Sequence, residues 1–289
     1  KINFKQKYKF SGKYGTNLME EVARYALVGG TIALQNDFDI IHAHDWLTYA
    51  AGVAAKRLTG KPLVVHVHAT EFDRTGENVN TQVYALEKMG MEAADRVITV
   101  SNLTRNIVIN RYGISPDKVV TVHNAVDFSG RNEIDVRRGV PEKVVTFLGR
   151  ITFQKGPEYF IEAANKVLKY YKNVRFVMAG SGDLLNRSIR RVAKLGISDR
   201  FHFTGFLRGA DVQKMFAISD VYVMPSVSEP FGISPLEAMR TGVPTIISKQ
   251  SGVAEVLKHS IKVDFWDIDA MADAIYGLLK YPSLGEMAS

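Results

Sequence analysis

The chain has 289 residues, of which 46% are hydrophobic and 23% are charged, a composition that excludes a largely disordered chain. Its 37 basic and 30 acidic residues leave a net charge of +7, which suits an anionic ligand. It contains no cysteine, which excludes a disulfide framework, Cys-ligated zinc and a thiol nucleophile.

The first element is predicted between Lys1 and Phe10, where lysines alternate with apolar residues as in a strand with one solvated face. No nucleic-acid-binding module accompanies these lysines, so we do not expect nucleic acid as a partner. Further along, short β-branched runs alternate with longer amphipathic stretches. We predict strands at 38–42, 63–67, 97–100, 119–122, 144–148, 174–179, 201–203, 221–224, 245–247 and 262–265, and helices that include 18–34, 84–94, 103–112, 158–171, 184–195 and 212–217.

This order of elements predicts the fold class. Nearly continuous apolar strands separated by helices are typical of parallel sheets covered on both faces, which form doubly wound α/β domains. Residues 124–142 lack periodicity and contain several turn residues, so we expect the interdomain linker there. The predicted domains are therefore 1–139 and 140–289, each the size of one Rossmann-like unit. Because the chain begins with Lys1 and few strands precede the linker, we expect the first domain to lack its beginning.

A membrane segment is not expected. No apolar run approaches the ~20 residues that a membrane-spanning helix needs, and no signal-peptide pattern is visible. We therefore expect a cytoplasmic location, with which the absence of cysteine agrees.

The segment after the predicted strand 221–224 carries the clearest site pattern. Glu229-Pro-Phe-Gly-Ile-Ser-Pro-Leu-Glu237 places two carboxylates eight positions apart, around a loop that leads into a helix. Main-chain amides at Phe231, Gly232 and Ile233 are suited to an anion at that helix start. Each carboxylate also has a structural alternative: Glu237 completes a capping box that begins at position 234, and Glu229 is a turn residue before proline.

Cations follow the predicted strand 144–148. Arg150 and Lys155 lie five positions apart on a strand-to-helix loop, and such a pair suits a diphosphate, although solvated surface cations would give the same pattern. Gly180 begins a Gly-Ser-Gly sequence after the strand 174–179. Since the third glycine of the dinucleotide-binding pattern is missing, a tight turn explains it equally well.

Four histidines end two strands of the first half. His42 and His44 alternate along one strand end, and His66 and His68 along the next, so each pair shares a face. With Asp45, they raise the alternative of a metal site. Neutral imidazoles that hydrogen-bond a polar ligand fit two separate α/β halves better, so we expect no metal.

Taken together, the motifs resemble the family of retaining GT-B glycosyltransferases, glycosyl transferases group 1 or family 4, that includes glycogen, sucrose and sucrose-phosphate synthases. The resemblance covers nearly the whole chain. It rests on residues 38–46 (Phe-Asp-Ile-Ile-His-Ala-His-Asp-Trp), 94–101, 122–127, Gly149-Arg150 with Gln154-Lys155-Gly156, and Ser228-Glu-Pro-Phe-Gly with Glu237. It implies two facing Rossmann-like domains, with a nucleotide-sugar donor held mainly by the second.

The resemblance also implies roles for individual residues. Arg150 and Lys155 are expected to neutralise the donor diphosphate, Glu237 to bind the ribose hydroxyls, and Glu229 to lie beside the donor sugar. The remaining expectations are that Phe231, Gly232, Ile233 and Gly180 contact the donor, that His68 reaches the donor sugar, and that His44 and Asp45 lie on the acceptor side.

The implied reaction transfers a sugar, with glucose favoured, from a nucleoside diphosphate to a hydroxyl of a glycan or sugar acceptor, without a cofactor or obligatory metal. Glycogen synthase-like transfer leads, and sucrose or sucrose-phosphate synthesis or mannosyl transfer remains open within the class. A nucleotide-sugar epimerase, a metal-dependent hydrolase and a non-catalytic binding module remain open outside it.

Overall fold

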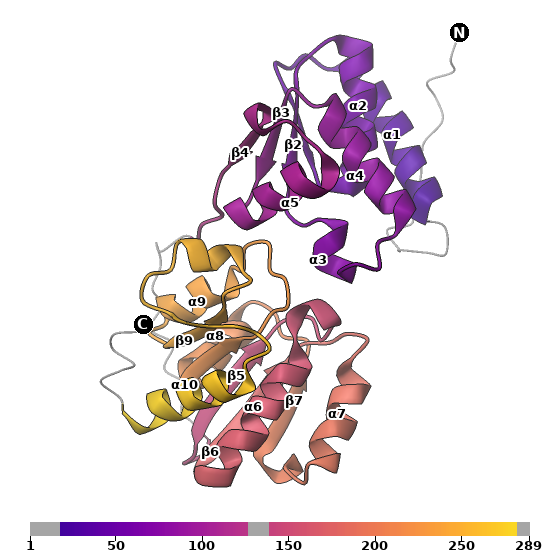
Figure 1. Cartoon of the computed structure of the whole chain (residues 1–289). Helices are drawn as coiled ribbons and strands as arrows, with labels where there is room; N and C mark the ends of the chain where they lie inside the picture. The colour runs from indigo at the N-terminus through magenta and orange to yellow at the C-terminus, as the bar shows by residue number, and fades with distance from the viewer. Residues whose placement is uncertain (1–17, 127–138, 282–289) are drawn as a thin grey trace. The chain divides into compact units, whose positions relative to one another are not determined.

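The structure is a computed structural model that describes residues 18–126 and 139–281. They form two compact units (Figure 1): one holds the residues up to Phe72 and Gly76–Val122, and the other holds Asp73–Thr75 and continues from His123. The strand expected within residues 1–10 and most of the expected linker lie outside the described residues. The domain boundary at 139/140 stays a prediction.

The first unit contains a parallel sheet of four strands in the order β1-β2-β3-β4. Helix α1 packs on α2, and α2 packs on α4. Gly90 permits the second contact, because a Cβ there would lie 2.5 Å from the Tyr49 side chain. The elements are α1 (Leu18–Gln35), β1 (Ile41–His44), α2 (Trp46–Thr59), β2 (Leu63–Val67), α3 (Glu71–Thr75), α4 (Thr81–Ala93), β3 (Arg96–Thr99), α5 (Asn102–Tyr112), the 3-10 turn η1 (Pro116–Lys118) and β4 (Val119–Thr121).

The second unit contains a parallel sheet of six strands in the order β10-β9-β8-β5-β6-β7. Helices α6 and α10 lie side by side (Figure 1) and share the core of buried aliphatic and aromatic side chains. The elements are β5 (Lys143–Leu148), η2 (Phe153–Lys155), α6 (Pro157–Tyr170), β6 (Val174–Ala179), α7 (Leu185–Lys194), η3 (Ser198–Arg200), β7 (Phe201–Gly205), α8 (Ala210–Ile218), β8 (Val221–Met224), α9 (Ser234–Arg240), β9 (Thr245–Ser248), η4 (Gly252–Glu255), β10 (Ile261–Val263) and α10 (Ile268–Lys280).

The parallel, doubly wound architecture confirms the predicted fold class. The strands predicted at 63–67, 174–179 and 221–224 match the structure at both ends. The strand predicted at 38–42 is instead β1, Ile41–His44, because pairing with β2 begins at Ile41 opposite Leu63 and continues to His44 opposite His66. Within the described ranges, no helix is both long and apolar enough to cross a membrane.

Candidate functional site

The sheet of the second unit reverses its winding between β5 and β8. From β5 the chain adds β6 and β7 on one side, and then returns to add β8, β9 and β10 on the other side. In open parallel sheets, ligands bind beyond the carboxyl ends of the strands at such a switch point. The segments that follow β5 and β8 are the two that carry Arg150, Lys155, Glu229 and Glu237.

The loop after β5 is supported by the turn after β6. The amide of Ile151 donates to the Ser181 carbonyl over 2.9 Å, and the amide of Leu184 donates to the Ile151 carbonyl over 3.0 Å. A Cβ at Gly180 would lie 1.8 Å from the Gly149 carbonyl oxygen, and one at Gly182 would lie 2.3 Å from the Ile151 oxygen. These two glycines therefore let two backbones approach closely, and the turn fixes the loop that presents Arg150.

A pocket of about 370 Å³ opens at this point of the second unit. It brings together Arg150, Gly180 and Glu237, which the sequence predicted as site residues. Arg150 is exposed, so its guanidinium is accessible to an anion. The pocket is lined by Leu148, Gly149, Arg150, Ala179, Gly180, Phe206, Leu207, Gly209, Val212, Gln213, Phe216, Glu237, Arg240 and Thr241.

Helix α9 does not begin with the capping box that was the structural alternative for Glu237. Ile233 occupies the N-cap position and makes no side-chain capping bond. Ser234 is the first helical residue, and its hydroxyl lies 2.8 Å from the Tyr222 hydroxyl. The Glu237 side chain lies in the first turn of α9 and lines the pocket.

Tyr222 on β8 connects the two strands of the switch point to α9. Its hydroxyl donates to the Leu148 carbonyl over 3.4 Å at the end of β5 and pairs with Ser234 at the start of α9. Burial raises the pKa of Tyr222, and the negative charges of Glu229 and Glu237 raise it further. The phenol therefore stays protonated and serves as a structural hydrogen-bond donor.

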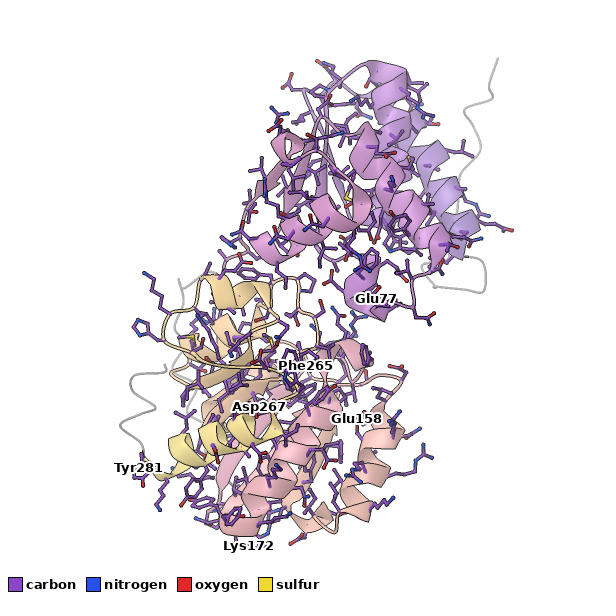
Figure 2. All side chains as sticks on the ribbon, viewed as in Figure 1. Glu77, Glu158, Lys172, Phe265, Asp267 and Tyr281 are labelled. Carbon is purple, nitrogen blue, oxygen red and sulfur yellow. The ribbon has the colours of Figure 1, made fainter. Side chains whose placement is uncertain are left out.

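Lys155 and Glu229 form an ion pair. The Lys155 ammonium donates to Glu229 Oε2, and the Ser226 hydroxyl donates to the same oxygen over 3.3 Å. The Lys155 and Glu229 side chains are 21% and 9% exposed, so the pair is shielded but remains open on the lysine side. Lys155 ends the short turn η2, just before α6. Glu158, labelled in Figure 2, lies in the first turn of α6 and so shows this end of the helix.

The loop that holds Glu229 is braced by the segment after β9. The Glu229 amide donates to the Gln250 carbonyl over 3.0 Å, and the Gly252 amide donates to the Glu229 carbonyl over 2.9 Å. The Val253 amide donates to the Phe231 carbonyl over 2.7 Å. Glu229 is thus held on both sides by main-chain bonds, as a catalytic or binding carboxylate would need to be.

The three residues expected to offer amides differ in their surroundings. Phe231 is 2% exposed and Ile233 is 43% exposed, so the Phe231 side chain belongs to the core. Gly232 has φ +96°, a conformation that favours glycine. Among the described residues, no hydrogen-bond acceptor is found for the main-chain amides of Phe231, Gly232 and Ile233.

In the first unit, the structure brings His44, His68 and Asp45 together. His44 Nδ1 lies 2.9 Å from His68 Nε2. The Asp45 carboxylate accepts hydrogen bonds from the His68 amide over 2.8 Å and the Ala69 amide over 3.4 Å. Asp45 also has φ +58°, an uncommon conformation for a residue with a side chain. Asp45 therefore fixes the main chain that carries His68.

His42 and His66 complete a ladder with His44 and His68 on β1 and the end of β2. Burial and the neighbouring imidazoles lower the pKa of His42, and the same causes lower the pKa of His66 to about 4. His66 is therefore neutral near pH 7. Both of its ring nitrogens are buried, and no hydrogen-bond partner is found for them among the described residues.

Some pocket residues were not predicted as site residues. Arg240 and Thr241 follow Glu237, and Gln213 on α8 faces the same pocket. The sequence could have predicted Arg240, since it lies three residues after Glu237 and so on the same face of the helix. The sequence could not have predicted Gln213, because its place in the pocket depends on the packing of α8 beside the switch point.

Comparison with known proteins agrees with this geometry. Residues 131–289 match the model of the family Glycosyl transferases group 1, and residues 23–129 match Glycosyltransferase Family 4. The chain belongs to the group 1 glycosyl transferases. The resemblance inferred from the sequence motifs is thereby confirmed.

Curated relatives share substantial sequence with this group 1 chain. An uncharacterized glycosyltransferase of Methanocaldococcus jannaschii is 35% identical over 238 residues, which cover 78% of this chain and 61% of that protein. UDP-Gal:alpha-D-GlcNAc-diphosphoundecaprenol alpha-1,3-galactosyltransferase of Escherichia coli is 29% identical over 255 residues, which cover 82% and 65% of the two chains. The chain thus spans less than two thirds of the length of both relatives.

Solved structures share the fold of this group 1 chain. Sucrose-phosphate synthase of Thermosynechococcus elongatus superposes with a TM-score of 0.80 at 20% identity, over 94% of this chain and 72% of that one. Anabaena HepE in complex with UDP and glucose gives a TM-score of 0.78 at 20% identity, over 96% and 77%. The GT-B fold with two Rossmann-like domains is confirmed.

Proposed function

We propose that this chain acts in a retaining glycosyltransferase that moves a hexose from a nucleoside-diphosphate sugar to a hydroxyl of a glycan or sugar acceptor. Glucose is the proposed sugar, with glycogen synthase-like transfer as the leading form. The observation that carries the proposal is the pocket at the β5/β8 switch point, which presents Arg150 and Glu237. A cation and a carboxylate in one pocket match the diphosphate and ribose of a nucleotide sugar.

Donor breakdown places negative charge on the leaving diphosphate. Arg150 is accessible beside the pocket, and Lys155 lies on the next turn of the same loop, before α6. Fixed cations stabilise developing charge without reorganisation, and Arg can bind a phosphate in a bidentate manner. We propose that these two side chains perform the neutralisation that a divalent metal performs elsewhere, so donor binding requires no metal.

We propose a front-face route, in which the leaving phosphate takes the proton of the acceptor hydroxyl. Glu229 Oε2 accepts hydrogen bonds from Lys155 and Ser226, which reduces its nucleophilicity and favours a positioning and electrostatic role over a covalent intermediate. In this proposal His68, fixed by Asp45, contacts the donor sugar, and His44 and Asp45 serve the acceptor side.

The names of the similar proteins mention different sugars. The Escherichia coli relative is named for UDP-Gal, a relative in Mycobacterium tuberculosis is a glycogen synthase, and HepE was solved with UDP and glucose.

Isothermal calorimetry of the chain against UDP-glucose, ADP-glucose and GDP-mannose, with and without EDTA, tests the proposal. Binding of one donor that EDTA leaves unchanged supports it, whereas binding that requires a metal would contradict the proposed role of the two cations.

A turnover assay with donor and acceptor tests the reaction itself. NMR of the product should show that the transferred sugar keeps its anomeric configuration, and inversion would contradict the retaining route. Release of free nucleoside diphosphate with an altered sugar, and without acceptor, would indicate an epimerase instead.

Glu237 gives a direct test of the pocket. Glu237→Ala should weaken binding of the nucleoside diphosphate roughly tenfold or more, because a hydrogen bond to a charged group contributes about 1.5–3 kcal/mol. Pyrophosphate binding should change little. Glu158→Ala is the matched control, since Glu158 lies in the first turn of α6 and pairs with Arg187. Unchanged nucleoside diphosphate affinity in a folded Glu237→Ala protein would exclude the ribose contact.

A further inference from the structure

Four imidazoles form a continuous ladder in the first unit. Ring centroids of His42 and His44 lie 4.3 Å apart, and those of His66 and His68 lie 4.2 Å apart. The rings of His42 and His66, on neighbouring strands, are parallel within 2° at 5.5 Å. The parallel register of β1 and β2, with His44 opposite His66, places all four on one face, because side chains alternate along a strand.

Three of these histidines offer nitrogens that converge. One ring nitrogen from each of His42, His44 and His66 lies within 4.8 Å of the other two. Nitrogens around a tetrahedral zinc, each about 2.0–2.1 Å from the ion, lie roughly 3.4 Å apart. His42 and His44 are exposed, so rotation of their side chains can close the difference. Three imidazoles with an open fourth position form a known type of zinc coordination.

His68 and His66 supply two independent observations that favour a metal. His68 Nε2 lies 2.9 Å from His44 Nδ1, and no hydrogen bond to His44 Nε2 is found among the described residues. A metal-binding histidine usually has its other ring nitrogen hydrogen-bonded in this way. His66 has two buried ring nitrogens without a partner among the described residues, and an unmet buried polar group costs about 1–3 kcal/mol. A metal ion would satisfy one of them.

The carboxylate nearest in sequence is already hydrogen-bonded. Asp45, the acidic residue next to the ladder in sequence, uses its carboxylate to accept from the His68 and Ala69 amides. The site therefore offers imidazole nitrogens, which select Zn²⁺, Co²⁺, Ni²⁺ or Cu²⁺ and disfavour Mg²⁺, a cation that prefers oxygen.

We propose that His42, His44 and His66 form a binding site for a divalent transition metal, with His68 orienting His44. The site lies within the first unit, whereas Arg150 and Lys155 belong to the second. The site shares His44 and His68 with the acceptor-side and donor-sugar roles proposed above, and the inference does not rest on that proposed activity. It also departs from the expectation, drawn from the sequence, that the chain holds no metal.

The test is direct metal binding by the full chain after treatment with EDTA and removal of the chelator. ZnCl₂ is titrated by calorimetry, and CoCl₂ is titrated by visible absorption, in which intense d–d bands report tetrahedral coordination. We expect one equivalent of each metal to bind. His42→Ala and His66→Ala should each weaken Zn²⁺ binding at least about tenfold, since even indirect support of a metal ligand is typically worth 10–100-fold.

The controls separate metal binding from folding. His259→Ala changes an exposed histidine of the second unit and should bind Zn²⁺ and Co²⁺ as the unmodified chain does. MgCl₂ should not displace Co²⁺. Circular dichroism shows whether each variant folds. If His66→Ala fails to fold, His42→Ala still tests the proposal, because His42 is exposed. Equal Zn²⁺ affinity of the unmodified chain and His42→Ala, or a Co²⁺ spectrum without tetrahedral bands, would overturn the proposal.

Discussion

At the scale of single residues, the structure changes how the charged site residues are understood. The sequence presents Lys155 and Glu229 as separate groups with separate ligands. In the structure they form one shielded ion pair, while Arg150 and Glu237 line the pocket. A phosphate that approaches Lys155 must therefore share the ammonium with Glu229 or displace that carboxylate.

Lys155→Ala should weaken binding of a nucleoside diphosphate roughly tenfold or more, with little effect on the free nucleoside, because a charge-assisted bond to phosphate is worth about 1.5–3 kcal/mol. Glu229→Gln should bind the diphosphate at least as tightly as the unmodified chain, since it removes the competing charge. Lys172→Ala is the control, because Lys172 is exposed beyond the far end of α6 (Figure 2). Equal losses for nucleoside and diphosphate in Lys155→Ala would place Lys155 away from the phosphates.

At the scale of elements, loops that are distant in sequence hold one another in place at the ends of β5, β6 and β8. The turn after β6 supports the loop that carries Arg150, and Tyr222 joins the end of β5 to α9. These contacts are main-chain or buried, so small changes of shape within them should propagate to the pocket.

Gly180→Ala tests this support. The added Cβ would lie 1.8 Å from the Gly149 oxygen at φ +147°, so the backbone must move. We expect a loss of about 2–4 kcal/mol in the free energy of unfolding, together with weaker nucleotide binding. Gly196→Ala is the matched control, because its φ is +69° but its added Cβ meets nothing within 4 Å. Its cost should be only about 1–2 kcal/mol from backbone strain, and equal losses in denaturant unfolding would refute the close-approach argument.

Asp95 performs a comparable joining role in the first unit. It accepts bonds from the Lys56 ammonium and from the Leu63 amide at the start of β2. The Lys56 hydrogen bond, followed by that of Leu63, lowers the pKa of Asp95 from its usual 3.8. Because the pKa is lower in the folded state, ionised Asp95 stabilises the fold at pH values above the unfolded-state pKa. This contribution is lost as the pH falls through the folded-state pKa.

The unfolding free energy of the unmodified chain should therefore decrease more steeply between pH 5 and pH 3 than that of Asp95→Asn. Urea unfolding at a series of pH values measures this. Asp37→Asn serves as the control, since the Asp37 side chain is solvent-exposed and its ion pair with Lys61 is long at 4.0 Å. Parallel pH profiles for the unmodified chain and Asp95→Asn would contradict the linkage.

At the scale of the whole molecule, the described residues build two separate hydrophobic cores, one in each unit. The proposed donor pocket is formed by residues of the second unit alone. A ligand stabilises the unit that it binds by mass action, by about 2.7 kcal/mol at one hundred times its dissociation constant.

A saturating nucleoside diphosphate should therefore raise the unfolding temperature of the second unit by a few degrees, as followed by hydrogen exchange of its β5 and β8 amides during heating. The β2 and β3 amides of the first unit should show no matching protection. Equal protection of both units would contradict a donor pocket contained in the second.

The sequence by itself determined the class of fold and predicted which charged residues belong to the candidate site. Periodicity is local information, so strands such as Leu63–Val67 and Val221–Met224 could be predicted at both ends. Motif spacing likewise predicted Arg150, Lys155, Glu229 and Glu237 as site residues. Tertiary structure decided what depends on contacts between distant segments. It set the strand register that places β1 at Ile41–His44, and it formed the Lys155–Glu229 ion pair. It also brought Gln213 and Arg240 to the pocket and made the nitrogens of His42, His44 and His66 converge. Sequence spacing cannot supply these contacts, because they depend on where sheet order and loop packing bring residues together.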